Sequence, residues 1–184
     1  MRLRSGLPTL RQKRAAAIVF DAFRAAKTRW GARLVQFSVQ SNHIHLLVEA
    51  NDKESLAQAM KGLAQRLARR LNRYFKRKGN LFADRYHEHI LRTPLEVRRT
   101  IRYVLRNHLK HAARASRPPL VDPMSTARYF DGFTTPPFRR ARDGCNLADD
   151  PPVAPPSTWL LRTGWRRLGL IAPNEVPAKT KGGA

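Results

Sequence analysis

The 184-residue chain has few of the features that mark secreted or membrane proteins. Its single cysteine, Cys145, rules out an internal disulfide and a cysteine-based zinc site. No apolar run approaches the ~20 residues needed to cross a bilayer, and the first residues, MRLR, lack the apolar core of a signal peptide. We therefore expect a cytoplasmic protein, in which a metal ion would be held by His, Asn, Asp, Glu or water.

Acidic residues are also scarce. The chain has 13 Asp and Glu against 36 Lys and Arg, which gives a formal charge of +23. Such a surplus repels the folded chain from itself unless a polyanion binds. We therefore expect a nucleic-acid partner, ahead of an anionic membrane surface or an acidic protein, and no insertion into a membrane.

Proline separates parts of different character. Most of the 13 prolines lie between residues 118 and 156, where periodicity is weak. The last segment, with Trp159, Trp165 and Ile171, is too short to fold alone, and among the main domain, a second subunit and nucleic acid we favour docking on the main domain. The sequence thus predicts a domain over residues 1–117, a proline-rich extension with a flexible linker (139–156) over residues 118–156, and a short basic amphipathic segment with its tail over residues 157–184.

Hydrophobic periodicity predicts alternating strands and helices in the first domain. Capping-box patterns at Thr9 with Gln12, and at Thr93 with Glu96, mark two helix starts. The alternating apolar residues of the first full strand should share one buried face: Val35, Phe37 and Val39. The predicted elements are a strand end at residues 2–4, a helix over 9–31, an antiparallel hairpin of strands 34–40 and 43–49, a helix over 53–78, an extended or hairpin segment over 81–91, and a helix over 93–115.

The second strand of the hairpin carries two histidines one residue apart. Side chains alternate along a strand, so His43, His45 and Leu47 share one face while Ile44 and Leu46 point to the other. The two imidazoles therefore lie side by side, with their Cα atoms roughly 6.5–7 Å apart, and both can reach one divalent ion. Taken alone, a His-x-His pattern is more often structural than metal-binding.

The last predicted helix places a phenol and a carboxamide on one face, because Tyr103 and Asn107 are four residues apart. We expect them outside the buried stripe, which is formed by Val97, Ile101, Val104, Leu105, His108 and Ala112. Basic residues should project around them: Arg99, Arg106, Lys110 and Arg114. A second basic row on the 53–78 helix should contact phosphates: Arg66, Arg70, Arg73 and Arg77.

The element order indicates an α+β protein with a ferredoxin-like, RRM-like antiparallel sheet. In that layout the last helix can lie against the face of His43 and His45 and bring Tyr103 and Asn107 toward these histidines. A phenolate is a competent nucleophile, and a divalent cation that polarises a phosphodiester lowers the barrier for its attack.

The chain resembles the HUH single-strand transposases, specifically their REP-associated tyrosine transposase branch. Three stretches carry the resemblance in the family's order and spacing: residues 42–48 (NHIHLLV), 79–92 (GNLFADRYHEHILR) and 102–107 (RYVLRN). Two departures are Gln40-Ser41, where the family usually has Met-Pro, and His108, where it usually has proline.

The resemblance implies that His43, His45 and Asn107 bind Mg²⁺ or Mn²⁺ and that Tyr103 is the nucleophile. It implies hairpin-flanked single-stranded DNA as substrate, a 5′-phosphotyrosine intermediate with a free 3′-hydroxyl, and rejoining without ATP. It also implies a homodimer, with a monomer as the alternative. Two other functions remain open: a non-catalytic protein that grips hairpin DNA or RNA through its arginines, and a metal-dependent phosphodiesterase that uses water.

Overall fold

The computed structural model describes residues 1–111, 121–135 and 150–176, without the side chains of residues 110 and 111. It is a mixed α+β structure with one two-stranded sheet among the described residues. In chain order its elements are α1 (Lys13–Ala26), β1 (Ala32–Val39), β2 (Ile44–Ala50), α2 (Lys53–Tyr74), α3 (Pro94–His111), the 3-10 helix η2 (Thr126–Tyr129), α4 (Trp159–Arg162) and the 3-10 helix η3 (Gly164–Leu168).

The two strands form the expected antiparallel hairpin, with Ser38 opposite His45. The register shifts between Leu34 and Gln36, so Val35 is an extra residue in β1. Val35 therefore turns away from Phe37 and joins the hydrophobic core on the opposite face. The prediction that Val35, Phe37 and Val39 share one face is wrong for Val35, because a one-residue bulge reverses the alternation.

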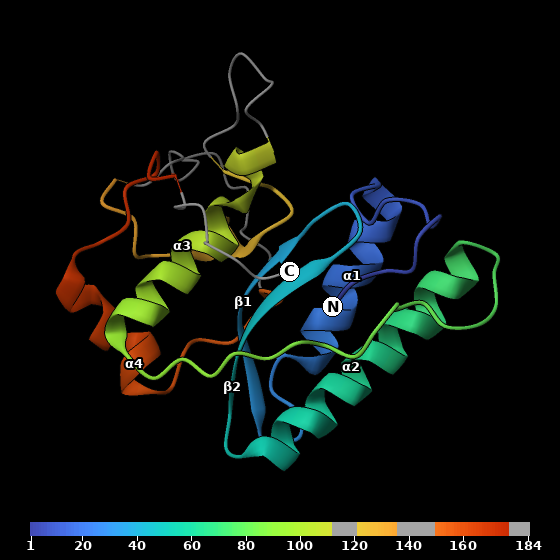
Figure 1. The fold of residues 1–184 in the computed structure, drawn as a ribbon, viewed down its shortest axis with the longest axis horizontal. Coiled ribbons are helices and arrows are strands. Elements are labelled where there is room, and N and C mark those ends of the chain that lie inside the picture. Colours follow the sequence, from blue (N-terminus) through green and yellow to red (C-terminus); the bar gives the residue numbers. More distant parts are fainter. Residues whose placement is uncertain (112–120, 136–149, 177–184) are drawn as a thin grey trace.

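Two short extended segments continue the sheet beyond β2. An isolated antiparallel bridge joins Arg2 to His43, and another joins Leu3 to Phe82. The predicted strand end at residues 2–4 is thus extended and paired. Beyond Phe82, the segment that leads to α3 has no regular structure and crosses in front of the strands (Figure 1), so the bent strand or hairpin expected over residues 81–91 is confined to one bridge.

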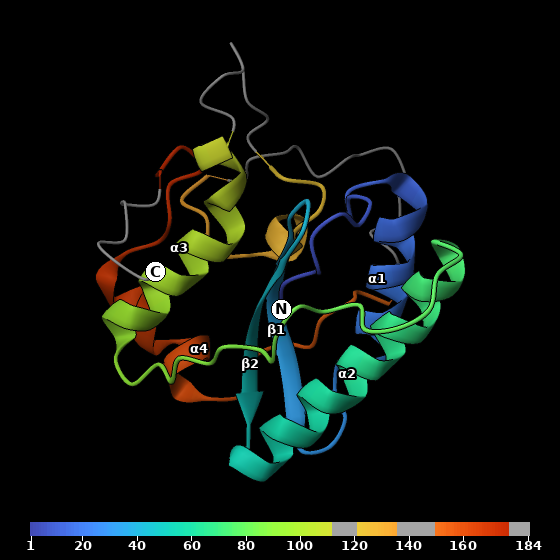
Figure 2. The ribbon, with the colours of Figure 1, turned by 45° about the vertical axis from the view of Figure 1, so that its right-hand side comes forward.

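Helices cover both faces of the hairpin. In both views α1 and α2 lie on one side of the strands, and α3 with α4 lies on the other (Figures 1 and 2). Phe23, Phe37, Ile44 and Leu67 belong to the core on the first side. The core on the second side contains Leu47 of β2 and one row of α3 residues, namely Val97, Ile101 and Leu105. The strand face that carries the histidines is therefore the face that meets α3.

Side-chain capping starts two of the three long helices among the described residues, α2 and α3. Thr93 Oγ1 accepts a hydrogen bond from the backbone N–H of Glu96, whose carboxylate accepts one from the N–H of Thr93, so the predicted capping box starts α3. The Asp52 carboxylate caps α2 by accepting from the N–H of Ser55. The box predicted at Thr9 does not form, because α1 begins at Lys13 after an N-cap residue without a side-chain bond. Helix α2 also ends earlier than predicted, at Tyr74.

The C-terminal segment packs on the main domain, as we favoured. Trp165 is only 1 % exposed and lies in the same core as Ile101 of α3, and Ile171 is buried there too. The backbone N–H of Ala154 donates to the carbonyl of Leu34. Residues 150–156 are thus packed rather than a flexible linker; residues 139–149, Cys145, Ala112 and Arg114 lie outside the described residues. None of the described helices combines the length and hydropathy of a membrane-spanning segment.

Candidate metal and tyrosine site

The two histidines of the His-x-His pattern point toward each other. Their Nε2 atoms are 3.0 Å apart, and their ring centroids are 4.7 Å apart in an edge-to-face arrangement. Both side chains are half-buried at the start of β2, where the sheet faces α3. The predicted juxtaposition of two imidazole nitrogens is therefore present.

Asn42 orients the first ring. Its Oδ1 lies 2.9 Å from Nδ1 of His43. Because an amide oxygen only accepts, the tautomer that forms this hydrogen bond carries its proton on Nδ1. The lone pair of the His43 ring is then on Nε2, the atom that faces His45. A hydrogen bond of this kind fixes the tautomer and orientation in which a histidine binds metal.

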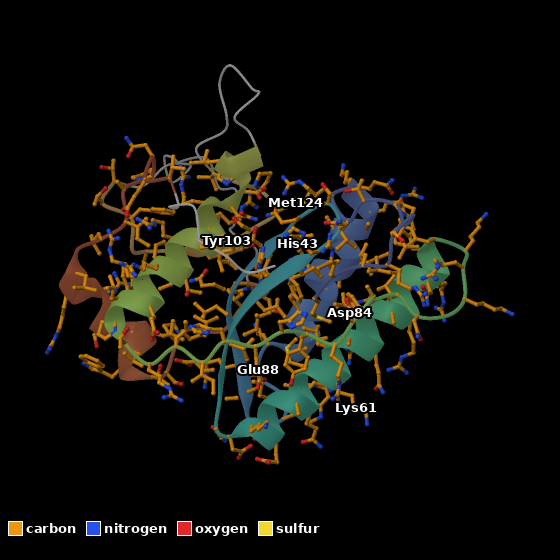
Figure 3. The ribbon with its side chains drawn as sticks, in the orientation of Figure 1. His43, Lys61, Asp84, Glu88, Tyr103 and Met124 are labelled. Carbon is orange, nitrogen blue, oxygen red and sulfur yellow. The ribbon has the colours of Figure 1, made fainter. Side chains whose placement is uncertain are left out.

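Helix α3 brings Tyr103 to the pair. Its hydroxyl lies 3.5 Å from Nε2 of His45, and the two rings meet edge to face with centroids 5.0 Å apart. Figure 3 labels Tyr103 on α3 and His43 at the hairpin, and the ring of His45 meets both of their rings edge to face. This approach depends on the core below, where Ile101 packs with Leu47 of the histidine strand.

Asn107 follows Tyr103 by one helical turn, but it is not outside the buried surface as expected. The residue is 2 % exposed, and its Nδ2 has no hydrogen-bond partner among the described residues. A buried amide normally has its bonds satisfied. The oxygen and nitrogen ends of a carboxamide are nearly the same size. Rotating the amide by 180° therefore places an oxygen atom, which can bind a metal ion, where the unpartnered nitrogen lies.

The residues fit a divalent ion. The two histidine nitrogens are 3.0 Å apart, which is an ordinary hydrogen-bond length. It is also about the separation of two cis ligands that each lie about 2.1 Å from an octahedral ion. Among the described residues, no group of three or more His, Cys, Asp or Glu could hold a metal. Within this part of the chain a third protein ligand would come from another residue type, and the carboxamide of Asn107, one helical turn after Tyr103, has suitable chemistry.

The basic patch expected around Tyr103 is smaller than predicted. Arg99 is exposed, but Arg106 is 0 % exposed and does not project into solvent. The reason is that α3 contacts the sheet on one side and α4 with η3 on another, so more than one row of the helix is covered. The side chain of Lys110 and all of Arg114 lie outside the described residues.

The basic row of α2 has three members on the helix instead of four. Arg66 and Arg73 lie on α2, and Arg70 lies 3.7 Å from a carboxylate oxygen of Asp21 on α1. Arg77 lies beyond the end of α2, and its guanidinium donates to the side chain of Asn72. Phosphate contact by these arginines stays a prediction.

A pocket of about 700 Å³ adjoins the site beside β2. His45 lines it, together with Leu47 and Glu49 from the same strand. The segment that crosses the strands forms the opposite wall with Tyr86, His87 and His89, among others. Tyr86, His87 and His89 thus lie along a pocket wall, in a segment without regular secondary structure.

Two acidic residues near the site make contacts that no local sequence pattern predicts. Glu49 is buried and accepts hydrogen bonds from the backbone and hydroxyl groups of Ser157 and Thr158. Burial raises the pKa of Glu49, but these bonds together hold it below its usual value. Glu175 pairs with Arg98 and Arg102 of α3, although more than 70 residues separate the partners.

Residues 9–107 match a family model described as "Transposase IS200 like". The match covers more than half of the 184 residues and includes His43, His45, Tyr103 and Asn107. No curated protein and no solved structure matches the chain.

Proposed function

The chain belongs to the IS200-like transposase family, and from this premise we propose that it is a metal-dependent enzyme that nicks and rejoins single-stranded DNA next to hairpins. The observation that carries the proposal is the 3.5 Å approach of the Tyr103 hydroxyl to Nε2 of His45. This contact places the only tyrosine of α3 beside the two histidines of the same chain.

Tyr103 is the proposed nucleophile. Its Oη attacks a DNA phosphorus, a phosphotyrosine bond forms, and the bond from phosphorus to the 3′ oxygen breaks. The phenol proton leaves to solvent, and the released 3′ oxygen takes up a proton from solvent. The products are a 5′-phosphotyrosine and a free 3′-hydroxyl, and attack by another 3′-hydroxyl reverses the step and rejoins DNA without ATP.

His43, His45 and Asn107 would hold Mg²⁺ or Mn²⁺. When bound, the ion supplies Lewis-acid polarisation of the phosphodiester. Asn42 keeps the His43 ring in the ligand tautomer through the 2.9 Å hydrogen bond to Nδ1. Both histidines are half-buried and so keep part of their surface open to solvent.

The proposal also covers the branch of the family, the sheet order, the location and the oligomeric state of the protein. The motifs at residues 42–48, 79–92 and 102–107 support the REP-associated branch. The bridges from Phe82 to Leu3 and from Arg2 to His43 support a four-stranded ferredoxin-like order. We place the enzyme in the cytoplasm, and the presence of histidines and tyrosine in one chain is compatible with either a monomer or a homodimer.

The test is covalent capture. Purified protein is incubated with Mn²⁺ and labelled hairpin-flanked single-stranded DNA, and denaturing gels resolve a protein–DNA adduct. We expect an adduct with the wild type and none with Tyr103→Phe, while Tyr86→Phe, the matched control at the second phenol, forms it normally.

The alternatives give other results. A non-catalytic nucleic-acid-binding protein, which the charge of +23 also favours, binds the hairpin equally well in wild type and His43→Ala and forms no adduct with any metal. A phosphodiesterase that uses water nicks DNA without an adduct and without dependence on Tyr103. Either outcome would refute the proposed tyrosine chemistry.

A further inference from the structure

Two arginines precede Tyr103 on the same helix and share one carboxylate. Arg98 and Arg102 lie one turn apart on α3, and their Nη1 atoms are 2.9 and 2.6 Å from Oε1 of Glu175. A second hydrogen bond of 3.1 Å joins Nη2 of Arg98 to Oε2. Glu175 thus bridges two consecutive turns of the helix that carries Tyr103, and Arg102 directly precedes that tyrosine.

The same arginine also holds the backbone of the C-terminal segment. Nε of Arg98 donates to the carbonyl of Gly169, and Nη2 donates to the carbonyl of Leu170, each at 2.9 Å. The backbone N–H of Ala172 donates to Oε2 of Glu175 at 3.3 Å. These polar contacts clamp residues 169–175 onto the outer side of α3.

Apolar packing continues the clamp beneath these contacts. Leu161, Trp165 and Ile171 lie in one core with Ile101 and Leu105 of α3. Helix α3 is therefore held between the sheet and a segment that lies outside the family match at residues 9–107.

We propose that Glu175 is a positioning residue, which by bridging Arg98 and Arg102 fixes α3 so that Tyr103 faces the histidines of its own chain. The expected effect on the reaction rate rests on the proposed function. The effect of Glu175 on the stability of α3 can be measured without catalysis.

The bridge is suited to positioning rather than to competition with DNA for the arginines. The side chains of Arg98 and Arg102 are only 16 % and 18 % exposed, which leaves little room for a phosphate. The Nε and both Nη atoms of Arg98 already donate to Glu175 or to backbone carbonyls. Removing Glu175 should therefore loosen the helix without creating a new DNA contact.

The kinetic test uses the full chain with Glu175→Gln. We expect the single-turnover rate of adduct formation to fall on the order of 10- to 100-fold, because small displacements of a nucleophile cost about this much. The dissociation constant for the same DNA without metal should stay within about twofold, since Glu175 carries no DNA contact in this proposal. Glu175→Asp, which keeps the charge on a shorter side chain, should recover part of the rate.

The matched control is Asp131→Asn. It removes the ion pair between Asp131 and Arg166 of η3, which ties the same C-terminal segment without touching α3. This variant should keep the wild-type rate. A full rate in Glu175→Gln, or tighter DNA binding with an unchanged rate, would overturn the positioning role.

Hydrogen exchange tests the clamp without catalysis. Amides of α3 from Arg98 to Asn107 should exchange faster in Glu175→Gln than in the wild type or in Asp131→Asn. Equal protection in all three proteins would overturn the proposal. Absence of an adduct in the wild type would instead refute the proposed function, and the exchange result would still decide whether Glu175 holds the helix.

Discussion

The hydroxyl of Tyr103 lies 3.5 Å from Nε2 of His45, although 58 residues separate the two positions in the chain. The contact arises because Leu47 of β2 and Ile101 of α3 share one core, so the histidine face of the strand is the face on which α3 packs. Packing and the proposed chemistry are thus linked, because a change that shifts α3 on the sheet also moves Tyr103, the proposed nucleophile.

Replacing Asn107 should separate function from stability. Within the part of the chain that the structure describes, its buried Nδ2 has no partner, and an unsatisfied buried polar group is costly. We expect Asn107→Leu to keep or raise the free energy of unfolding, by up to about 1 kcal/mol, while adduct formation is lost. Urea unfolding and the covalent capture assay measure the two effects. Asn107→Asp is the control, because it keeps an oxygen atom that can bind a metal ion. An undiminished adduct in Asn107→Leu would exclude Asn107 as a metal ligand.

Removing the orienting group of His43 should weaken metal binding without unfolding the protein. Asn42 is exposed, so Asn42→Ala should leave the melting temperature unchanged. Affinity for Mn²⁺, measured by calorimetry, should fall on the order of tenfold because the His43 ring loses its fixed tautomer. Ser41→Ala, in the same exposed turn, should bind normally. Equal affinity in both variants would show that Asn42 does not orient a ligand.

Features set by neighbouring residues could be predicted from the sequence. The capping box of Thr93 and Glu96 uses atoms three residues apart, and the hairpin that carries His43 and His45 follows from strand alternation on both sides of a short turn. The family resemblance then placed Tyr103 and Asn107 in the same candidate site.

Features that depend on contacts between distant segments could not be predicted from the sequence. The bulge at Val35 depends on pairing with β2, and a single inserted residue reverses which face is buried. Arg106 has the helical phase of a surface residue, but α3 is covered on more than one side. The partners of Glu49 and Glu175 lie over 70 residues away, and no local pattern indicates them.

Glu49 should contribute strongly to stability. It is 8 % exposed and accepts bonds from both the backbone and the hydroxyl groups of Ser157 and Thr158. In Glu49→Gln an amide NH₂ replaces one acceptor and faces donors, so we expect a loss of about 2–3 kcal/mol in the free energy of unfolding. Urea titration at neutral pH measures it. The exposed Glu88→Gln is the control, and losses of equal size would argue against the buried bonds.

Glu175 should contribute stability that depends on acid. Hydrogen bonds from Arg98 and Arg102 outweigh burial and lower the pKa of Glu175 to about 2. Since the folded pKa lies below the unfolded one, the stabilisation is present above about pH 4.5 and is lost as the pH falls toward 2. After allowance for solvent screening of this partly exposed cluster, we expect about 1–2 kcal/mol.

The measurement is urea unfolding of the wild type and Glu175→Gln at pH 7, 4 and 3. The difference in unfolding free energy should be largest at pH 7 and should shrink steadily toward pH 3. Asp131→Asn, whose partner is the surface residue Arg166, should show a small difference throughout. A difference in Glu175→Gln that stays constant over this range would contradict the lowered pKa.

The basic row of α2 should govern the salt dependence of DNA binding. If Arg66 and Arg73 each contact one phosphate, each Gln substitution should weaken binding to different hairpin sequences about equally and lower the slope of log K against log salt by about 0.7–1. Fluorescence anisotropy between 50 and 200 mM salt measures both. Arg162→Gln is the control, because this exposed arginine lies on α4, on the other side of the strands from α2 (Figure 1). Equal slopes in all variants would exclude α2 from the DNA interface. Arg99 of α3 would then be the next candidate, because it is the exposed cation nearest in sequence to Tyr103 among the predicted DNA contacts.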